Sequence, residues 1–575
     1  MSKYQDLTKE ELLKKLWELE NELKNKKYWL VWDAEKFPEQ VVLECENNLP
    51  VLEDVKLKEI KNPPAFGIPL NKGDLNWDYN ILIEWDNYHA LTVLNYTHEA
   101  KIDVIYIDPP YNTGNKDFIY NDKFIEKEDK FRHSKWLNFM EKRLKLAQKL
   151  LKDDWVIFIS IDDNEQAQLK LLCDKIFWEE NFVWKWMWFR SATPPNLSHK
   201  IKKNFEYIIW YEKVKNNKKY VWVKKESKST DPFTKPQNTL KILKFPPNTI
   251  IFNNFTKWLI KNWIYWTSKF PNKLLNDLII ENWYNKNEVS FENKFVWLQE
   301  KLNEELINNT KVFCSKDLVL SYKKENYSNE VPPNIIDFSV WVETTEQAWN
   351  NLIEIFWEKL FDYPKPVSLI SYLINFINKK DSTILDFFAW SWTTWHAVLD
   401  LNKEDWWNRK FILCTNNENN ICEEITYKRL EKVINWYNKK WDWEFVEWLG
   451  WNLKYFKTSL VKKTRSRSQL KINITKKCTE MLCLKENIFD LDLEKENYKI
   501  FSSNNKDRFL AVYYNFIKED FNEFLEELKK LKSEIIVYIF SVDNTFDKSL
   551  FKWLNVRIEA IPQKILEVYK ALMKV

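Results

Sequence analysis

The chain has 575 residues, of which 45% are hydrophobic and 30% are charged. This composition is typical of a globular chain of roughly three to five domains, and it excludes an intrinsically disordered protein. The 88 basic and 84 acidic residues give a net charge of +4. Such a balance excludes a strongly basic nucleic-acid tail, but it is compatible with a nucleic-acid enzyme whose basic surface is local.

Glycine and tryptophan have unusual frequencies. The chain contains 4 glycines and 32 tryptophans, whereas average usage predicts roughly 40 glycines in a chain of this length. Glycine supplies the left-handed turns and close backbone approaches that a large protein needs. We therefore expect most Trp letters to stand for glycine in the natural protein, as a UGA codon read as glycine but translated as tryptophan would produce. Some, such as Trp136, are expected to be genuine. The alternative is a protein truly rich in tryptophan.

The 7 cysteines and 5 histidines are scattered along the chain. They show neither a C-x-x-C pair nor the spacing of a zinc site, so we expect free thiols and no metal. The N-terminus has no apolar signal core, and no apolar run approaches the roughly 20 residues that cross a bilayer. These features predict a soluble, cytoplasmic protein.

Residues 7–26 are predicted to form a helix, because Leu12, Leu16, Leu19 and Leu23 recur at helical spacing. The leucine stripe spans about two heptads, which is short for a coiled coil. We expect this helix either to pack on its own domain or to form a dimer contact.

Two segments alternate apolar strands with amphipathic helices, which is the pattern of a parallel α/β sheet. The first covers residues 80–190 and the second covers residues 351–450. The expected strands are 81–84, 103–107, 156–161, 383–387 and 410–414, and the expected helices are 87–96, 136–151, 165–177, 368–378 and 394–401.

The segment between them is rich in lysine, asparagine, aromatic residues and proline and loses this rhythm. It is predicted to be an inserted domain. The end of the chain is rich in lysine and glutamate and predicts a separate domain, with a helix near 520–531 and a strand at 535–540. The predicted domains are an N-terminal region 1–60, a first α/β half 61–190, the insertion 191–350, a second α/β half 351–457 and a C-terminal domain 458–575.

The strand at 103–107 leads directly into Asp108-Pro109-Pro110-Tyr111. In open α/β sheets, functional sites lie at the carboxyl ends of strands. The two prolines fix the backbone and remove two N–H groups, so the Asp108 carboxylate and the Pro109 carbonyl can accept both N–H donors of an exocyclic amine. Tyr111 can stack on an aromatic base. The plainer alternative is a tight turn after a strand.

This motif resembles that of the amino-group DNA methyltransferases, which transfer a methyl group from S-adenosylmethionine to adenine N6 or cytosine N4. Aspartate in the first position resembles the adenine-N6 members, whereas the cytosine-N4 members more often carry serine there. The resemblance implies that residues 108–111 are catalytic. A base inside a DNA duplex cannot reach the carboxyl end of a β-strand of the protein, so the target base has to be flipped out of the duplex. Positioning and charge placement can supply the catalysis without a metal.

A second motif, Phe388-Ala389-Trp390-Ser391-Trp392, lies between a predicted strand and a predicted helix. A turn that approaches a nucleoside-bearing cofactor needs small residues. Read with glycine for tryptophan, the segment becomes FFAGSGTTG and is then very similar to the F-x-G-x-G cofactor loop of the same methyltransferases. If the natural protein does carry tryptophan at these positions, a DNA-specificity subunit with an inactive cofactor site becomes the stronger interpretation.

The resemblance also implies roles for side chains around this loop. Asp386 is expected to order the loop or to face the amino group of the cofactor's methionine, and Lys365-Pro366 to border the methionine moiety. Glu418 follows the next strand, where acidic side chains often bind ribose hydroxyls. Asp86 is expected near the adenine ring of the cofactor. Helix caps and surface carboxylates are the alternatives for these residues.

The catalytic motif precedes the insertion and the cofactor loop follows it, an order that resembles the beta class of amino-methyltransferases. The amino-acid sequence is still more similar to the modification subunit of type III restriction–modification systems, over about residues 27–190 and 350–457. This resemblance implies a permuted, Rossmann-like α/β sheet that depends on S-adenosylmethionine. It also implies that the insertion is a target recognition domain and that a small α/β domain ends the chain.

The partners that the resemblance implies are duplex DNA, a separate helicase–nuclease restriction subunit and a second copy of the chain. The sequence has no phosphate loop G-x-x-x-x-G-K-[ST], so cleavage would need that separate subunit. DNA contacts are expected at a basic–aromatic cluster, for which a solvated lysine-rich face is the alternative. Cytosine N4, an RNA base or a protein glutamine amide remain open as other substrates. The basic residues of the cluster are Arg190, Lys200, Lys202 and Lys203.

Overall fold

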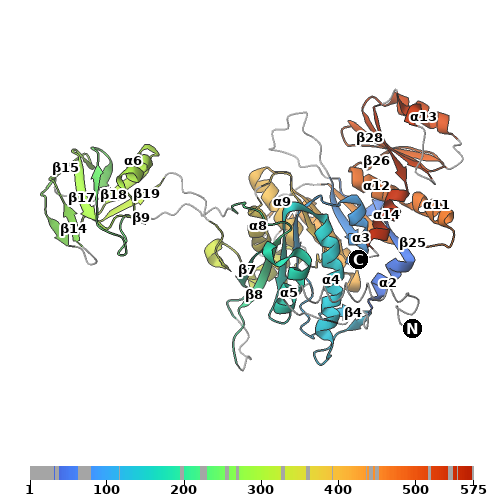
Figure 1. Ribbon diagram of the computed structural model, residues 1–575, viewed down its shortest axis with the longest axis horizontal. Helices are drawn as coiled ribbons and strands as arrows, with labels where there is room; N and C mark the ends of the chain where they lie inside the picture. Colours follow the sequence, from blue (N-terminus) through green and yellow to red (C-terminus); the bar gives the residue numbers. More distant parts are fainter. Residues whose placement is uncertain are drawn as a thin grey trace, which may run out of the picture. The chain divides into compact units, whose positions relative to one another are not determined.

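The computed structural model of the chain contains two compact units, one made of Met1–Lys218 and Pro333–Val575 and the other of Lys219–Pro332 (Figure 1). The second unit falls within the segment that the sequence predicts as an insertion. The residues that the structure describes are 32, 38–61, 79–115, 117–193, 200–220, 230–252, 258–266, 271–324, 331–357, 363–377, 379–390, 393–435, 437–438, 445–446, 452–515, 520–541, 548–552 and 555–572.

A ten-stranded sheet with the order β1-β25-β2-β22-β21-β3-β6-β8-β7-β20 forms the centre of the first unit. The strands from β25 to β6 run parallel to one another, and β1, β8 and β7 add antiparallel pairs. The strands are β1 (Asn48–Asp54), β2 (Asn80–Glu84), β3 (Ile102–Ile107), β6 (Leu151–Ile161), β7 (Phe182–Phe189), β8 (Phe205–Glu212), β20 (Ile335–Ile336), β21 (Thr383–Asp386), β22 (Lys410–Thr415) and β25 (Leu453–Lys462).

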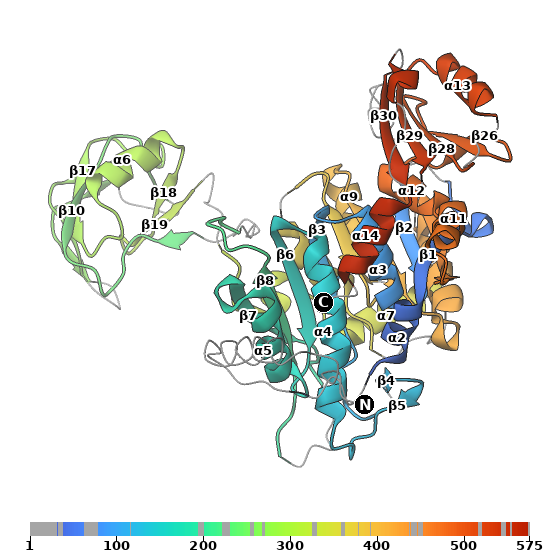
Figure 2. The ribbon, with the colours of Figure 1, turned by 45° about the vertical axis from the view of Figure 1, so that its right-hand side comes forward.

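Helices cover both faces of this sheet (Figure 2). The connections from β2 to β3, from β3 to β6 and from β6 to β7 all run in one direction across the sheet, and their helices α3, α4 and α5 pack side by side. The connections that contain α8, α9 and α10 run in the opposite direction, and right-handed crossovers place them on the other face. These helices are α3 (Asn87–Thr97), α4 (Arg132–Leu150), α5 (Gln166–Phe177), α8 (Val367–Asn375), α9 (Thr393–Asp405) and α10 (Lys428–Asn435).

The direction of the connections changes between β3 and β21, which are neighbours in the sheet. Ile384 pairs with Val104 and Leu385 with Ile105, so the carboxyl ends of the two strands lie side by side. Ligands of open α/β sheets bind in the crevice at such a switch point. The topology therefore places Asp108, which follows β3, beside the loop that follows β21.

The central strands are buried because helices cover both faces. Every residue of β2 and β3 is buried, as expected for the near-continuous apolar strands of a parallel sheet. On α4, Leu137, Met140 and Leu144 recur at spacings of three and four residues and enter the core. Burial on both sides makes the carboxyl ends of these strands rigid supports for a site.

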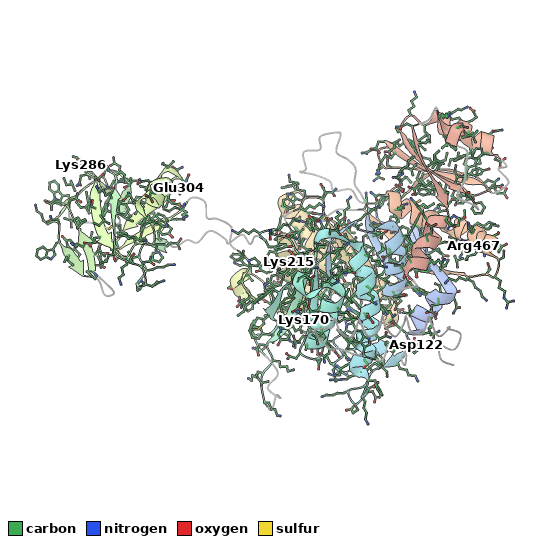
Figure 3. The ribbon with its side chains drawn as sticks, in the orientation of Figure 1. Asp122, Lys170, Lys215, Lys286, Glu304 and Arg467 are labelled. Atoms are coloured by element: carbon green, nitrogen blue, oxygen red, sulfur yellow. The ribbon has the colours of Figure 1, made fainter. Side chains whose placement is uncertain are left out.

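The second unit is rich in β-strands and has its own hydrophobic core. It contains a seven-stranded sheet and a four-stranded sheet, and charged side chains such as Lys286 and Glu304 lie on its surface (Figure 3). Its elements are β9 (Asp231–Pro232), β10 (Lys241–Phe245), β11 (Ile250–Phe252), β12 (Leu259–Ile260), β13 (Ile264–Trp266), β14 (Pro271–Leu274), β15 (Leu278–Glu281), β16 (Tyr284–Asn285), β17 (Val289–Asn293), α6 (Gln299–Ile307), β18 (Lys311–Cys314) and β19 (Leu320–Lys323).

The C-terminal part of the first unit carries a five-stranded sheet with the order β26-β27-β28-β29-β30. Phe524 and Leu528 of α13 belong to the core of this sheet. Its elements are α11 (Arg467–Lys477), α12 (Thr479–Glu486), β26 (Asp490–Glu494), β27 (Tyr498–Ser502), β28 (Arg508–Tyr513), α13 (Phe521–Lys530), β29 (Glu534–Phe540), β30 (Val556–Ile561) and α14 (Gln563–Leu572). Outside the sheets described above lie α2 (Gln40–Asn47), α7 (Thr345–Phe356), β4 (Ile119–Tyr120), β5 (Lys123–Phe124), β23 (Tyr437–Asn438) and β24 (Phe445–Val446).

The predicted α/β fold with a parallel central sheet is confirmed. The strands and helices expected in the two alternating segments all appear, such as the strand at 103–107 within β3 and the helix at 394–401 within α9. The helix expected at 7–26 lies outside the described residues. Among the helices that the structure describes, none is both long and apolar enough to cross a membrane.

Five tryptophans have backbone φ angles between 57° and 69°, in the left-handed region. This conformation brings Cβ close to the following carbonyl oxygen and is rare for bulky residues. Two of them, Trp178 and Trp357, end helices α5 and α7, where glycine is the preferred residue. All five indoles are exposed, so they add little to any core. The five are Trp178, Trp283, Trp341, Trp357 and Trp406.

One of these positions has the requirements of a known turn. Asn282 and Trp283 form the two-residue connection between β15 and β16, with φ angles of 51° and 68°. Two consecutive positive φ angles define a type I′ hairpin turn, for which Asn-Gly is strongly preferred. Trp136 differs from these five tryptophans, since it lies within the helix α4 and its side chain is buried. The backbone thus separates tryptophans that occupy glycine positions from one that belongs to the core.

We expect Trp178→Gly, Trp283→Gly and Trp357→Gly each to raise the free energy of unfolding by up to about 1 kcal/mol. The reason is that relief of a left-handed strain of about 1–2 kcal/mol outweighs the backbone entropy that glycine loses. Urea denaturation measures the change. Trp136→Gly is the control and should lower the stability by about 3 kcal/mol or more. Equal destabilisation by Trp283→Gly and Trp136→Gly would contradict the distinction between turn and core tryptophans.

Candidate active site

A pocket with a volume of about 800 Å³ opens at the carboxyl ends of the parallel strands, a size within the usual range for small-molecule sites. Asp108 follows β3, Phe388 follows β21, Glu418 follows β22 and Asp86 follows β2. These side chains come from two parts of the sequence, and all of them line this pocket together with Lys365. The sheet topology therefore gathers most of the residues that the sequence singled out.

The turn after β3 is held by two indole N–H groups. Nε1 of Trp136 donates to the Pro110 carbonyl at 2.7 Å, and Nε1 of Trp390 donates to the Asp108 carbonyl at 2.9 Å. The polar loop that follows turns at Gly114, where φ is 81° and a Cβ atom would lie 2.7 Å from Cα of Lys127. These contacts fix the backbone that carries the Asp108 carboxylate.

The Asp108 carboxylate is paired with a lysine ammonium. Nζ of Lys365 lies 3.0 Å from Oδ1 and 2.9 Å from Oδ2 of Asp108, and 3.4 Å from Oε2 of Glu206. The Tyr111 hydroxyl donates to Glu206 Oε2 at 3.0 Å, and Nη1 of Arg190 donates to Glu206 Oε1 at 2.8 Å. Two carboxylates and two cations thus form one connected cluster around residues 108–111.

The cluster shifts the ionisation of its members in different directions. Burial raises the pKa of Asp108 above its ordinary value, although Lys365 opposes the shift. Burial alone would lower the pKa of Lys365, but the Asp108 and Glu206 carboxylates raise it. Burial would raise the pKa of Glu206, but Lys365 and Arg190 hold it below its ordinary value. Of the two carboxylates, Asp108 is therefore the one better able to accept a proton.

Asp386 organises the loop after β21. Its Oδ1 accepts from the backbone N–H of Phe388 at 3.0 Å, and its Oδ2 accepts from the hydroxyl of Thr394 at 2.6 Å. Thr393, beside it on α9, donates to the carbonyl of Lys365 at 2.7 Å. These bonds tie the loop, the start of α9 and the Lys365 segment together. Burial raises the pKa of Asp386 to about 7.

Asp86 has a structural role on the other side of the pocket. Its Oδ1 accepts from the backbone N–H of Tyr88 at 2.7 Å and caps α3. The fully buried guanidinium of Arg143 lies 3.1 Å from Asp86 and 2.7 Å from Glu39. The neighbouring Asn87 donates to the Phe387 carbonyl at 2.9 Å, so the β2 end and the β21 end of the pocket are directly connected.

The remaining predicted site residues are Glu418, Pro366 and the loop residues that follow Phe388. Glu418 lies at the pocket wall, and burial raises its pKa. Ala389 is buried beside Phe388, and Pro366 precedes α8. Ser391 and Trp392 lie outside the described residues. The loop can therefore be followed from Asp386 as far as Trp390.

The predicted basic cluster divides into two groups. Arg190 lines the pocket and pairs with Glu206, whereas Lys200, Lys202 and Lys203 are exposed. Lys203 also contacts Asp163 at 3.0 Å. Arg190 is thus part of the charged cluster around Asp108 and Glu206, and the three lysines form a separate exposed group.

Sequence reasoning missed Glu206, Arg143 and Asn87. Glu206 did leave a signal, because it is a charged residue near the start of the apolar strand Phe205–Glu212, and a buried carboxylate needs partners. Arg143 left none, because a charged residue on an amphipathic helix is ordinarily exposed.

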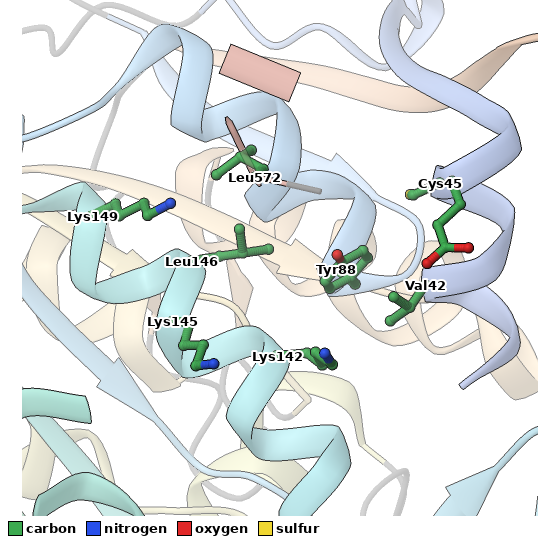
Figure 4. Close-up of a pocket in the computed structure, with 9 residues that line it drawn as sticks. Val42, Cys45, Tyr88, Lys142, Lys145, Leu146, Lys149 and Leu572 are labelled. Atoms are coloured by element: carbon green, nitrogen blue, oxygen red, sulfur yellow. The ribbon is translucent and has the colours of Figure 1, made fainter. Parts of the chain in front are cut away.

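A second pocket lies where α2, α3, α4 and α14 meet (Figure 4). Its volume is about 80 Å³, below the range of small-molecule sites. Tyr88 and Leu146 form part of its apolar wall, and Lys142, Lys145 and Lys149 lie along α4 beside it. This pocket is too small for a nucleoside, whereas the larger pocket has a suitable volume and gathers the predicted residues.

Comparison with known proteins gives consistent matches. A family model described as DNA methylase matches residues 102–428. The chain is 31% identical over 386 residues to the type III restriction-modification enzyme StyLTI Mod subunit of Salmonella typhimurium, covering 62% of this chain and 56% of that one. It is 33% identical over 361 residues to the type II methyltransferase M.KpnI of Klebsiella pneumoniae, covering 60% and 82%.

Among solved structures, the cytosine-N4-specific PvuII DNA methyltransferase is 11% identical, with 64% of this chain and 89% of that chain covered and a TM-score of 0.32. The chain spans little more than half the length of the Salmonella typhimurium Mod subunit.

The raised pKa of Asp386 predicts a pH-dependent stability. The folded state holds a proton on Asp386 up to about pH 7, whereas the unfolded state releases it near pH 4. The stabilisation is therefore complete below about pH 4 and is lost as the pH rises toward 7. We expect Asp386→Asn to remove this decline when the free energy of unfolding is measured by urea denaturation between pH 4 and 7. Parallel pH profiles for Asp386→Asn and the unaltered chain would contradict the assignment.

Proposed function

Since this chain belongs to the DNA methylase family, we propose that it transfers the methyl group of S-adenosylmethionine to N6 of adenine in duplex DNA, as the modification subunit of a type III restriction–modification system. The observation that carries the proposal is the position of the Asp108 carboxylate, which lies at the switch point of the sheet and lines the same pocket as Phe388 and Glu418.

The half of the pocket beyond β21 and β22 fits S-adenosylmethionine. Glu418 presents a carboxylate that can accept hydrogen bonds from ribose hydroxyls, and Phe388 offers an aromatic face to a base. Asp386 holds the backbone of the loop in place through Phe388. When it is bound, the cofactor supplies an electrophilic methyl group.

The half of the pocket around β3 fits the amino group of a flipped base. The Asp108 carboxylate can accept an N–H of that group, and the Pro109 carbonyl is the second acceptor that we expect, since Trp136 bonds the carbonyl of Pro110. Tyr111 borders the space where the base would stack. This arrangement directs the nitrogen lone pair away from Asp108. The amine must lose a proton when it gains a methyl group, and burial makes Asp108 the better proton acceptor of the two carboxylates.

The type III assignment and the partners rest on the relatives. The Salmonella typhimurium relative is a type III Mod subunit, which supports a separate restriction subunit as a partner. A second copy of this chain stays a prediction. We assign target recognition to the second unit, Lys219–Pro332, because it has its own core and interrupts the methyltransferase between β8 and β20. The methyltransferase then consists of the predicted halves 61–190 and 351–457 together with β8 and β20, which the sequence had placed in the insertion but which pair into the central sheet. The regions 1–60 and 458–575 lie at the two ends.

Asp108→Ala tests the proposed function. We expect the methylation rate to fall by at least about 1,000-fold, because the amino group loses both its anchor and its proton acceptor, while DNA affinity stays within about 3-fold. The measurement is methyl incorporation into unmethylated plasmid DNA, followed by mass spectrometry of the nucleosides. Asp153→Ala, at a carboxylate that is 81% exposed and pairs only with Lys213 among the ion pairs described, is the matched control. N6-methyladenine should form; N4-methylcytosine, or methylation of RNA or protein instead of DNA, would refute the adenine assignment.

Replacement of Lys200, Lys202 and Lys203 together by alanine tests the DNA contact. Each phosphate contact that is lost should reduce the slope of log affinity against log salt by about 0.9. Fluorescence anisotropy of labelled duplex DNA between low and high salt gives this slope. The control replaces three other exposed lysines by alanine and so makes the same change in charge. They are Lys529 and Lys530 of α13 and Lys532 after it. An unchanged slope in the first variant would exclude these lysines from the interface.

A further inference from the structure

The Lys365 ammonium faces both oxygens of the Asp108 carboxylate, at 3.0 and 2.9 Å. Under the proposed function, an N–H of the target adenine has to bond this same carboxylate. We propose that Lys365 holds the place of the target amino group in the free protein, and that Glu206 is the positioning residue that takes over the ammonium when the base enters. This inference rests on the proposed function and extends it to two further side chains.

An ammonium and an exocyclic amine compete for Asp108 because both present N–H donors to the same acceptor. The ammonium is nearly equidistant from the two oxygens, so it occupies the side of the carboxylate that faces both. It also lies 5.0 Å from the centre of the Tyr111 ring, the ring on which the base would stack. Binding of the base therefore requires Lys365 to move.

Glu206 is placed to receive the displaced ammonium. Its Oε2 lies 3.4 Å from Nζ of Lys365, so a small shift turns this contact into a close ion pair. The carboxylate is fixed by the Tyr111 hydroxyl on one oxygen and by Arg190 on the other. It stands on β8, opposite Trp188 of β7 in the antiparallel register. A rigid sheet strand thus holds the second acceptor in place.

The buried charges make a second carboxylate necessary. Lys365 is 7% exposed, and the two carboxylates raise its pKa, so it stays protonated at neutral pH. A buried ammonium that left Asp108 without a new partner would incur a large desolvation penalty. Glu206 is available as that partner because Lys365 and Arg190 keep its pKa low and its carboxylate ionised.

The movement would also activate Asp108. While Lys365 is bound, its charge holds the pKa of Asp108 down. Once the ammonium has moved toward Glu206, its charge lies farther from Asp108 and lowers the pKa of that carboxylate less, so this pKa rises further. A more basic carboxylate is the better acceptor for the proton that N6 loses on methylation. Binding of the base and proton acceptance are thus coupled through one lysine.

A double-mutant cycle tests this inference. In Glu206→Gln, Lys365 keeps Asp108 as its one remaining carboxylate, so we expect kcat/KM for unmethylated plasmid DNA to fall by about 10- to 100-fold, the range for loss of a charged hydrogen-bond partner. In the Lys365→Met background no ammonium has to be displaced, so adding Glu206→Gln should then change kcat/KM by less than about 3-fold. The cycle compares the kcat/KM values of the four proteins, with the DNA affinity and the folded fraction measured for each of them.

A merely structural role of Glu206 gives a different result. If Glu206 only oriented Tyr111 or Arg190, Glu206→Gln would cause the same loss with and without Lys365, and that outcome would overturn the inference. Tyr111→Phe separately measures the loss of the Tyr111–Glu206 hydrogen bond. If Glu206→Gln does not fold, Glu206→Asp takes its place, because the shorter side chain withdraws the carboxylate from Lys365 and should show the same rescue by Lys365→Met.

The unaltered protein separates this inference from the proposed function. If neither it nor its Trp390→Gly variant methylates DNA, the proposed function fails before the cycle begins. If it methylates adenine and the two mutations act independently, the function stands and the inference about Lys365 and Glu206 fails.

A different observation supports a second inference. We infer from the backbone that the natural protein carries glycine at positions 178, 283, 341, 357 and 406. These five tryptophans all have left-handed φ angles and exposed side chains. They occur at helix ends and at a two-residue hairpin turn, the positions at which glycine relieves strain. Random placement of a bulky residue would not select these sites.

The same substitution would affect the active site. The Trp390 indole lies 6.3 Å from the Phe388 ring, stacked at 21°, and bonds the Asp108 carbonyl. It therefore fills space between the two halves of the pocket. Glycine at position 390 would widen the pocket between Asp108 and Phe388, where the methyl donor and the amino group have to meet.

Peptide mass spectrometry of the protein isolated from its natural source tests this inference. We expect glycine at the five left-handed positions and tryptophan at position 136, and we expect the gene to carry UGA at the five positions and UGG at position 136. Tryptophan in the natural peptide that contains position 283, or UGG at any of the five codons, would overturn it.

Discussion

The parallel pairing of β3 with β21 is the constraint on which the site depends. Asp108 and Trp390 are 282 residues apart in the sequence, yet they are joined by a hydrogen bond, because their strands are adjacent and end at the same edge of the sheet. The connections leave this point in opposite directions, so no crossover helix covers it. A crevice at this edge follows from the strand order, and the pocket lined by Asp108 and Phe388 lies there.

The charges in the crevice are balanced in a way that makes their positions interdependent. Glu206 is a buried carboxylate and Asp108 a half-buried one, and Lys365 and Arg190 neutralise them. The buried groups, Lys365 and Glu206, cannot be left unpaired without a large desolvation penalty, so a ligand that takes one partner has to leave them a new arrangement. This is why a side chain outside the catalytic motif, Glu206, can control access to the motif.

The unusual composition also has a structural counterpart. A chain with 4 glycines and 32 tryptophans still needs left-handed turns, and the fold adopts several of them at tryptophan positions and others at residues such as asparagine. Trp136 shows that the tryptophans are not equivalent, because its indole is buried and bonds the Pro110 carbonyl. The backbone angles therefore distinguish the tryptophans at left-handed turns from a tryptophan in the core.

The sequence by itself determined the elements and the motifs. Apolar runs and helical spacing are local patterns, so they predicted β3, β21 and the flanking helices, and the residues at 108–111 and 386–390 stood out by their place after strands. The tertiary structure alone decided the partners of these residues. Sequence patterns carry no information on which buried carboxylate meets which cation. Glu206, which lies 95 residues after Tyr111, and Arg143, which reaches Glu39 across 104 residues, became part of the site only when the strands and helices packed.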